Sequence, residues 1–316
     1  MNRQQKWQAR KVFISCVIPV FNEEANIVGF TEQLAVFLQS LTDHFEILIV
    51  DDGSSDKTPE LIKTQLLSDT VKWIRFSRNF GKENALTAGL HHAKGEVVLL
   101  IDSDFQHPFA TIPQFFEKWQ QGYDMAYGVR SNRNDEGFIK RHVTHWFYAL
   151  ISKISKVPIP ADAGDFRLID RRVVTALNRY NEHSRFMKGL YAYVGFKSIA
   201  VPYPVEKRKQ GQSSFRLRRL FELALTGIIS FSDLPLRIWG LIGLIISSIS
   251  FLYALWIVFD TLYYGVDLPG YPTLVVCILF FGGIQLLSIG ILGEYIARIF
   301  QEVKKRPLYI IEEESL

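Results

Sequence analysis

The most informative stretch of the chain is Glu96-Val-Val-Leu-Leu-Ile-Asp-Ser-Asp-Phe-Gln-His-Pro108, an apolar run followed at once by acidic and amide side chains. The run from Val97 to Ile101 predicts a short strand that is buried on both faces. Two carboxylates, Asp102 and Asp104, come directly after it. Because parallel α/β sheets bind ligands at the carboxyl ends of their strands, these side chains mark the place where a site is expected.

The same alternation of strand and helix patterns extends along the first 130 residues. Asn22-Glu23 follows the first predicted strand and Asp51-Asp52 follows the second, although each cluster alone could also be a helix cap or a turn. The pattern predicts an α/β fold with a Rossmann-like, mainly parallel sheet and helices on both faces. The predicted strands span 12–20, 45–50, 71–76, 96–101 and 123–129, and the predicted helices span 24–41, 58–67, 83–93 and 112–121.

The composition excludes several classes of protein. Of the 316 residues, 48% are hydrophobic, which is enough for a large core and excludes an intrinsically disordered chain. The two cysteines are too few for a disulfide-rich scaffold. A net charge of +4 gives no support for a nucleic-acid partner. The motifs G-x-G-x-x-G and G-x-x-x-x-G-K-[ST] are absent, which disfavours a dinucleotide-dependent oxidoreductase and a P-loop enzyme.

The mean hydropathy of +0.09 is high for a soluble enzyme, and the apolar residues are concentrated near the C-terminus. Segments 238–259 and 273–293 carry no charge and predict two transmembrane helices, since a span takes roughly 20 apolar residues; buried core helices are the alternative. Basic residues flank the pair at Arg237 and within 298–306, whereas the connecting loop 260–272 has no Lys or Arg. The positive-inside rule therefore predicts a multi-pass protein of the cytoplasmic membrane with its catalytic domain and both termini in the cytoplasm.

Two further segments combine helical apolar periodicity with neighbouring basic residues. We expect an interfacial helix at about 142–155 and an amphipathic juxtamembrane helix within 213–235; packing of both against the globular domain is the alternative. The predicted organisation is a cytoplasmic catalytic domain at 1–212, the juxtamembrane helix at 213–235, a two-helix membrane domain at 236–298 and a cytoplasmic tail at 299–316.

The segment after the fourth predicted strand has the chemistry of a divalent-cation site. Asp102, Asp104 and Gln106 offer hard oxygen ligands that suit Mg²⁺ or Mn²⁺. Mg²⁺ usually combines one or two carboxylates with substrate phosphates, so the pattern suits a nucleotide-diphosphate substrate. A lone D-x-D occurs by chance in many proteins, and its position at a strand end is what strengthens it here. We expect His107 to be structural rather than a ligand.

These motifs together resemble the family-2 glycosyltransferases, which have the GT-A fold. The segments that carry the resemblance are 17–24 (VIPVFNEE), 50–56 (VDDGSSD), 78–82 (RNFGK) and 102–108 (DSDFQHP). Segment 164–168 (GDFRL) and the paired C-terminal spans resemble bacterial polyprenyl-phosphate glycosyltransferases more closely, a group that includes bactoprenol glucosyltransferases and is similar to dolichol-phosphate mannose synthases. Some members of this group form tetramers, so the resemblance allows for a homo-oligomer.

The resemblance implies roles for the residues that match the family's motifs. Residues implied in holding the nucleotide-sugar donor are Pro19, Asn22, Glu23, Asp52, Ser54, Lys82 and Asp102. Those implied in holding the metal are Asp102, Asp104 and Gln106. The acceptor phosphate is expected to meet Arg130, Arg141 and Arg208. Asp165, within GDFRL, and Asp104 are expected at the reacting centre.

The implied reaction is attack by a lipid phosphate oxygen on the anomeric carbon of the sugar, with release of nucleoside diphosphate. A phosphate monoester is largely dianionic at neutral pH, so a strong general base is not required. We expect transfer of a hexose, glucose from UDP-glucose, to undecaprenyl phosphate; GDP-mannose, UDP-N-acetylglucosamine and a modified pentose donor stay open. Competing interpretations are a processive polysaccharide synthase, which the absence of Q-x-x-R-W disfavours, and a non-catalytic nucleotide-sugar-binding membrane protein.

Overall fold

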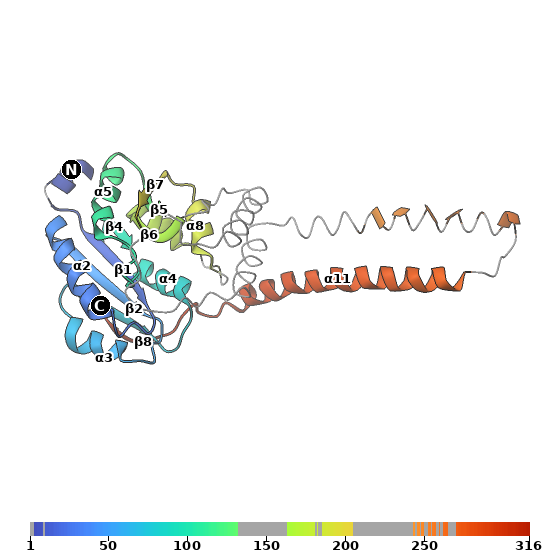
Figure 1. The fold of residues 1–316 in the computed structure, drawn as a ribbon, viewed down its shortest axis with the longest axis horizontal. Helices are drawn as coiled ribbons and strands as arrows, with labels where there is room; N and C mark the ends of the chain where they lie inside the picture. Colours follow the sequence, from blue (N-terminus) through green and yellow to red (C-terminus); the bar gives the residue numbers. More distant parts are fainter. Residues whose placement is uncertain are drawn as a thin grey trace.

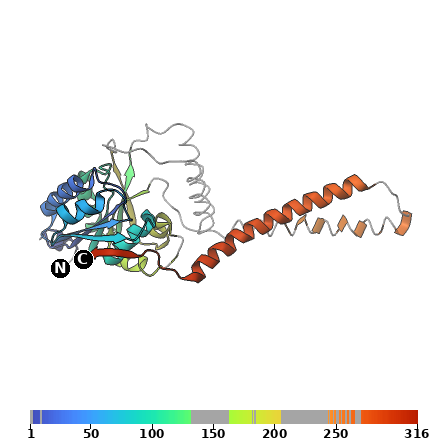
Figure 2. The ribbon, with the colours of Figure 1, turned by 90° about the horizontal axis from the view of Figure 1, so that it is seen from below.

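The computed structural model describes residues 3–8, 10–131, 163–180, 182, 185–204 and 270–316, together with scattered residues between 243 and 264. The described residues form an α/β domain from which one long helix projects (Figures 1 and 2). The predicted interfacial helices at 142–155 and 213–235, with Arg141 and Arg208, lie outside the described residues. The first predicted span, 238–259, falls largely outside them as well.

One sheet of eight strands organises the domain, in the order β7-β5-β6-β4-β1-β2-β3-β8. Six strands run parallel to one another, and β6 and β8 run antiparallel to their neighbours. This confirms the predicted α/β fold with a mainly parallel sheet. The strands are β1 (Ile14–Val20), β2 (Phe45–Asp51), β3 (Val71–Phe76), β4 (Val97–Leu100), β5 (Met125–Arg130), β6 (Ala163–Asp170), β7 (Ser198–Tyr203) and β8 (Ile311–Ser315).

Helices cover both faces of the sheet because successive strand residues point to opposite sides. In β1, Ile14, Cys16 and Ile18 enter one core, whereas Val17 enters the other. The first core is closed by α2 (Ile27–Leu41), η1 (Ile62–Leu66), which follows α3 (Thr58–Leu61), and α5 (Ile112–Gln120), which follows η2 (Phe109–Thr111). The second is closed by α4 (Lys82–His92), α7 (Arg171–Leu177) and α8 (Met187–Tyr193).

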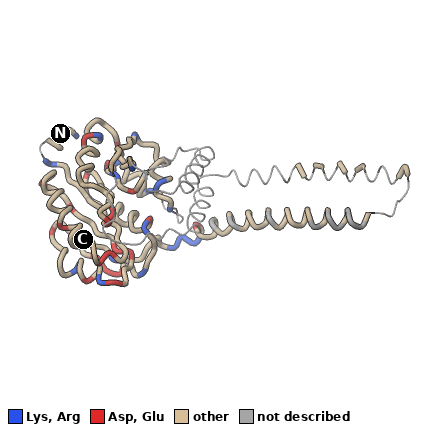
Figure 3. The backbone as a smooth tube through the Cα atoms, viewed as in Figure 1, with Lys and Arg blue, Asp and Glu red and all other residues tan. Residues whose placement is uncertain are grey.

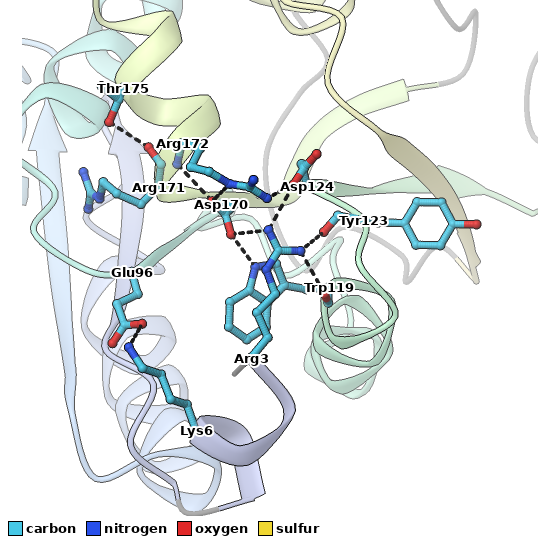
Figure 4. A network of polar contacts seen from close by, with 10 residues as sticks. All are labelled: Arg3, Lys6, Glu96, Trp119, Tyr123, Asp124, Asp170, Arg171, Arg172 and Thr175. Carbon is cyan, nitrogen blue, oxygen red and sulfur yellow. Dashed lines mark hydrogen bonds and ion pairs between the residues drawn. The ribbon is translucent and has the colours of Figure 1, made fainter. Parts of the chain in front are cut away.

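The N-terminal helix α1 (Arg3–Gln8), which the sequence pattern did not predict, is fastened to the amino-terminal edge of the sheet by a polar network (Figure 4). The guanidinium of Arg3 donates to Asp124 at 3.0 Å and to Asp170 at 2.7 Å, and also to two backbone carbonyls. Asp170 accepts a further bond from the indole of Trp119 at 2.8 Å. These contacts tie α1 to α5 and β6.

The residues from Ile311 to Ser315 form a strand at the edge of the sheet, which was not predicted. Strand β8 pairs antiparallel with the edge strand β3, and just before it Tyr309 stacks on Phe76 with ring centroids 4.9 Å apart. The last residues of the expected cytoplasmic tail are therefore an edge strand of the catalytic sheet.

Helix α11 (Tyr271–Lys304) contains the second predicted span, 273–293. Among the described residues, Phe280–Lys304 is the helix long and apolar enough to cross a membrane. Most of its described apolar side chains, such as Leu286 and Ile289, are exposed. Figure 3 shows that charged residues gather where α11 joins the α/β domain.

Candidate active site

A pocket of about 310 Å³ opens at the carboxyl ends of the parallel strands, where acidic clusters were expected to meet. It is lined by residues that follow β1, β2 and β4 and by the start of α4. Six of the predicted residues line it: Pro19, Glu23, Asp52, Lys82, Asp102 and Asp104. Other lining residues, including Phe21, Asn79 and Ser103, lie within the motif segments but were not assigned a role.

Hydrogen bonds between side chains and backbone N–H groups join the loops after β1 and β2. The hydroxyl of Ser54 accepts the backbone N–H of Asn22 at 2.9 Å, and the Asn22 side-chain oxygen accepts the N–H of Ser55 at 2.9 Å. Gly53 has φ +70°, and a Cβ there would lie 2.4 Å from the backbone of Arg78, so the turn requires glycine. Asn22 and Ser54 therefore shape these loops, and they are not among the residues that line the pocket. Their predicted contact with the donor stays a prediction.

Asp52 fixes the start of α4 as well as lining the pocket. Its carboxylate accepts the backbone N–H groups of Phe80 at 2.7 Å and Gly81 at 2.9 Å. Burial raises the pKa of Asp52, although these two hydrogen bonds favour the ionised form. Because Gly81 immediately precedes α4, Asp52 also fixes the position of Lys82, the first residue of that helix.

Lys82 joins two acidic residues that come from different strands. Its ammonium lies 2.7 Å from a carboxylate oxygen of Asp102, after β4, and 2.9 Å from one of Asp165, in β6. Burial alone would raise the pKa of each carboxyl, but Lys82 outweighs it, and the pKa values of Asp102 and Asp165 both fall below their usual range. Both groups are therefore carboxylates at neutral pH.

The predicted metal ligands lie in one short loop. Phe105 adopts φ 59°, and Asp104 accepts the backbone N–H of Gln106 at 3.0 Å. The side-chain oxygen of Gln106 accepts a hydrogen bond from Arg130 at 3.2 Å.

These three oxygen-bearing side chains fit a hard divalent cation by their donor chemistry. Among the described residues, no three His, Cys, Asp or Glu side chains are placed to hold a metal. The predicted ligand set of Asp102, Asp104 and the amide oxygen of Gln106 stays a prediction.

His107 lies beside this loop as a buried, packed side chain. Its ring stacks on Phe166 with centroids 4.7 Å apart, and Nε2 lies 3.6 Å from Asp102. This placement agrees with the structural role expected for His107. Arg130 is exposed at the end of β5, and its predicted contact with the acceptor phosphate stays a prediction.

Sequence reasoning missed three residues near the pocket: the buried Arg167 and Tyr191 and the half-buried Glu83. Burial, together with nearby Asp165, raises the pKa of Glu83 to about 7. Arg167 is 2% exposed, and its guanidinium carbon lies 3.6 Å from the centroid of the Tyr191 ring. The available signals were proximity in sequence, since Glu83 follows Lys82 and Arg167 lies two residues after Asp165.

Comparison with known proteins decides the family. The model of glycosyl transferase family 2 matches residues 15–177, which contain the pocket and the GDFRL segment. The chain belongs to glycosyltransferase family 2. It is therefore a transferase, and residues 234–299 match the model of the GtrB C-terminal hairpin.

Relatives along the whole chain include the bactoprenol glucosyl transferase of Shigella phage SfV. It is 48% identical over 303 residues, which cover 96% of this chain and 99% of that protein. A prophage bactoprenol glucosyl transferase homolog of Escherichia coli K12 is 46% identical over 300 residues, with 95% of this chain and 98% of that protein covered.

Among solved structures, glucosyl-3-phosphoglycerate synthase of Mycobacterium tuberculosis, in complex with Mn²⁺, UDP-glucose and phosphoglyceric acid, is similar to this chain. The TM-score is 0.50 at 19% identity, and the match covers 71% of this chain and 81% of that one. At this identity the likeness concerns the fold, which is the α/β GT-A fold that the sequence motifs implied.

Proposed function

We propose that this glycosyltransferase moves a sugar from a nucleotide-diphosphate donor to a polyprenyl phosphate at the cytoplasmic face of a membrane. The observation that carries the proposal is the presence, on one chain, of the acidic pocket and of the exposed apolar helix α11. Its relatives named as bactoprenol glucosyl transferases match over nearly the full length, which supports a lipid acceptor.

On the donor side, the nucleoside enters between the loops after β1 and β2. Pro19 and Glu23 form one wall and Asp52 the other, and Asp52 accepts hydrogen bonds from the base or ribose. Asp102, Asp104 and Gln106 would hold Mg²⁺ or Mn²⁺, which would supply charge neutralisation at the diphosphate leaving group.

On the acceptor side, the phosphate of the lipid is the nucleophile. Arg130 receives it beside Gln106, because a guanidinium suits phosphate oxygens, and Arg141 and Arg208 complete its binding. Asp165 is held as a carboxylate by Lys82. Because the acceptor phosphate is largely dianionic, Asp165 orients groups at the reacting centre, where no base is needed to remove a proton.

The donor we propose is UDP-glucose, and the transferred sugar is glucose. The RNFGKE and GDFRL segments support this choice, since they resemble bactoprenol glucosyltransferases most. GDP-mannose, UDP-N-acetylglucosamine and a modified pentose donor are the alternatives.

For the membrane, we propose two spans, 238–259 and 273–293, with the catalytic domain and both termini in the cytoplasm. The match of residues 234–299 to a C-terminal hairpin model and the helix α11 support this arrangement. We place the juxtamembrane segments 142–155 and 213–235 at the lipid surface, and the resemblance allows for a homo-oligomer such as a tetramer.

A donor panel tests the proposal. Detergent-solubilised protein is incubated with Mg²⁺ or Mn²⁺, undecaprenyl phosphate and each of the radiolabelled donors UDP-glucose, UDP-N-acetylglucosamine, GDP-mannose and a UDP-pentose. We expect release of nucleoside diphosphate that depends on the lipid and is fastest with UDP-glucose. Rapid turnover with another donor would correct the sugar assignment, and a water-soluble polymer as the product would replace the lipid acceptor by a growing polysaccharide.

A further inference from the structure

We propose that Glu83, Arg167 and Tyr191 form a brace that positions Lys82 and Asp165 for the transfer reaction. None of the three lines the pocket, so each acts through the residues that it holds. The inference concerns the site of the proposed function and rests on that function where it invokes turnover.

Strand β6 places Asp165 and Arg167 on the same face of the sheet, because alternate residues of a strand share a face. Phe166, between them, points to the opposite core. The guanidinium of Arg167 folds back to donate to the carbonyl of Gly164, the residue before Asp165. This contact fixes the backbone from which the Asp165 side chain reaches Lys82 at 2.9 Å.

Tyr191 holds that guanidinium from the other side. Its ring, on α8, lies over Arg167 at 3.6 Å, which is close contact for a stacked arginine. The Tyr191 hydroxyl is buried and makes no hydrogen bond with the described part of the chain. The ring is therefore the part of Tyr191 that acts on Arg167.

Glu83 links the same helix to Lys82. Its carboxylate accepts the backbone N–H of Met187, the first residue of α8, at 2.9 Å. Glu83 directly follows Lys82 in α4, so α4 and α8 are fixed to each other at the residue next to the ammonium that contacts Asp102 and Asp165. The brace thus runs from Lys82 through Glu83, α8, Tyr191 and Arg167 back to Asp165.

The brace matters to catalysis because small displacements of oriented groups are costly. A misplacement of about 1 Å can reduce a rate on the order of 100-fold. Loosening the brace should therefore lower kcat more than it changes the KM for the donor, because Glu83, Arg167 and Tyr191 do not line the pocket.

Variants on α8 separate this role from simple destabilisation. Tyr191→Leu removes the ring, Tyr191→Phe keeps it without the hydroxyl, and Tyr193→Leu makes the same change at an exposed tyrosine of the same helix. Glu83→Ala tests the other end of the brace, and Glu83→Gln restores a hydrogen-bond acceptor for Met187.

Rates are measured with the donor that the panel selects. The concentration of active sites is determined by calorimetric titration with nucleoside diphosphate, and each rate is divided by it to give kcat. We expect Tyr191→Leu and Glu83→Ala to lower kcat at least about tenfold with KM for the donor within about twofold. Tyr191→Phe and Glu83→Gln should recover most of the rate. Equal kcat values for Tyr191→Leu, Glu83→Ala and Tyr193→Leu would overturn the brace.

Hydrogen exchange provides a readout that needs no turnover. In Glu83→Ala and Tyr191→Leu, amides in 80–84 and 187–191 should exchange faster than in the wild type, while those of β2 should not change. Unchanged exchange at 187–191 in Glu83→Ala would refute the brace even if wild-type protein transferred no sugar, an outcome that would instead reject the proposed function.

Discussion

Asp104 is the residue on which the metal assignment depends most. Replacing it by the isosteric Asn removes a carboxylate ligand and preserves the shape of the loop. Because metal stabilisation of charge is worth several kcal/mol and about 1.4 kcal/mol is tenfold in rate, we expect kcat/KM of Asp104→Asn to fall on the order of 100-fold. The control is Asp43→Asn, an exposed carboxylate just before β2 at the opposite edge of the sheet. Turnover of Asp104→Asn equal to that of the control would reject the metal site.

Glu83 gives a prediction for stability as a function of pH. Its pKa is raised from 4.5 to about 7 by burial and by Asp165, with Lys82 and Lys188 acting in the opposite direction. The folded protein therefore binds a proton that the unfolded chain has released, so Glu83 lowers stability as the pH rises from about 4.5 to 7. Over that interval the loss reaches at most about 3 kcal/mol.

Glu83→Gln removes this ionisation. Between pH 4.5 and 7.5, the melting temperature of the variant should fall less, or rise more, than that of the wild type. Parallel melting curves for the two proteins across this range would show that Glu83 does not titrate as described.

At the level of single residues, the sequence was most informative where acidic side chains come soon after a run of apolar residues. Asp52, Asp102 and Asp104 could be placed at the pocket because each comes directly after a strand that is buried on both faces. Asn22 and Ser54 could not be separated from pocket residues, since a loop contact and a ligand contact use the same polar atoms. Arg167 was not assigned a role because its partner Tyr191 lies on a helix that the pattern did not predict.

Among the elements, β8 carries the clearest prediction for stability. Just before β8, the ring of Tyr309 stacks on Phe76, and its hydroxyl lies 3.2 Å from Nδ1 of His91. Strand β8 itself pairs with β3. Loss of the ring in Tyr309→Ala should cost about 2 kcal/mol, from the apolar area it covers, and lower the melting temperature by a few degrees. Leu316→Ala, which truncates an exposed side chain after β8, is the control. Equal melting temperatures for the two variants would mean that the contact between Tyr309 and Phe76, which holds the start of β8 against the sheet, does not stabilise the protein.

Helix α1 allows a second test at this scale. Arg3→Met keeps the apolar stem and removes the guanidinium that satisfies Asp124 and Asp170. We expect a loss of about 1 to 3 kcal/mol, the cost of leaving charged hydrogen-bonding groups without their partner. Arg10→Met, at an exposed pair with Asp43, should change the unfolding free energy by less than about 1 kcal/mol. The free energy of unfolding of both variants is measured with denaturant. Equal values would show that the contacts of Arg3 with Asp124 and Asp170 do not stabilise the domain.

The elements also show the limit of local sequence patterns. The parallel strands β1 to β4 were predictable because each is a short apolar run between helical segments. Strand β8 was not, since Ile311-Glu-Glu-Glu-Ser315 has the composition of a solvated tail and becomes a strand through pairing with β3, far away in sequence. Strand β6 was not predicted as a strand, although its motif GDFRL was identified. It lies antiparallel between β4 and β5 and so departs from the repeated pattern of strand and helix that predicted the others.

For the whole molecule, the sequence separated a catalytic part from a membrane part. Helix α11 projects from the α/β domain (Figure 1). Most of its described apolar side chains are exposed, which agrees with the second predicted span. The first span and the two juxtamembrane helices stay predictions. This arrangement matters to function because a lipid acceptor requires an active site held at the membrane.

The most direct test of the central claim follows the fate of the sugar. Protein reconstituted in liposomes receives radiolabelled UDP-glucose and Mg²⁺ or Mn²⁺, with or without undecaprenyl phosphate in the bilayer, and the label is measured after extraction with organic solvent. We predict that label enters the organic phase only when the lipid phosphate is present, is released from the product by mild acid, and is lost with Asp104→Asn. Label that stays entirely in the aqueous phase for every donor of the panel, with the lipid present, would contradict the account.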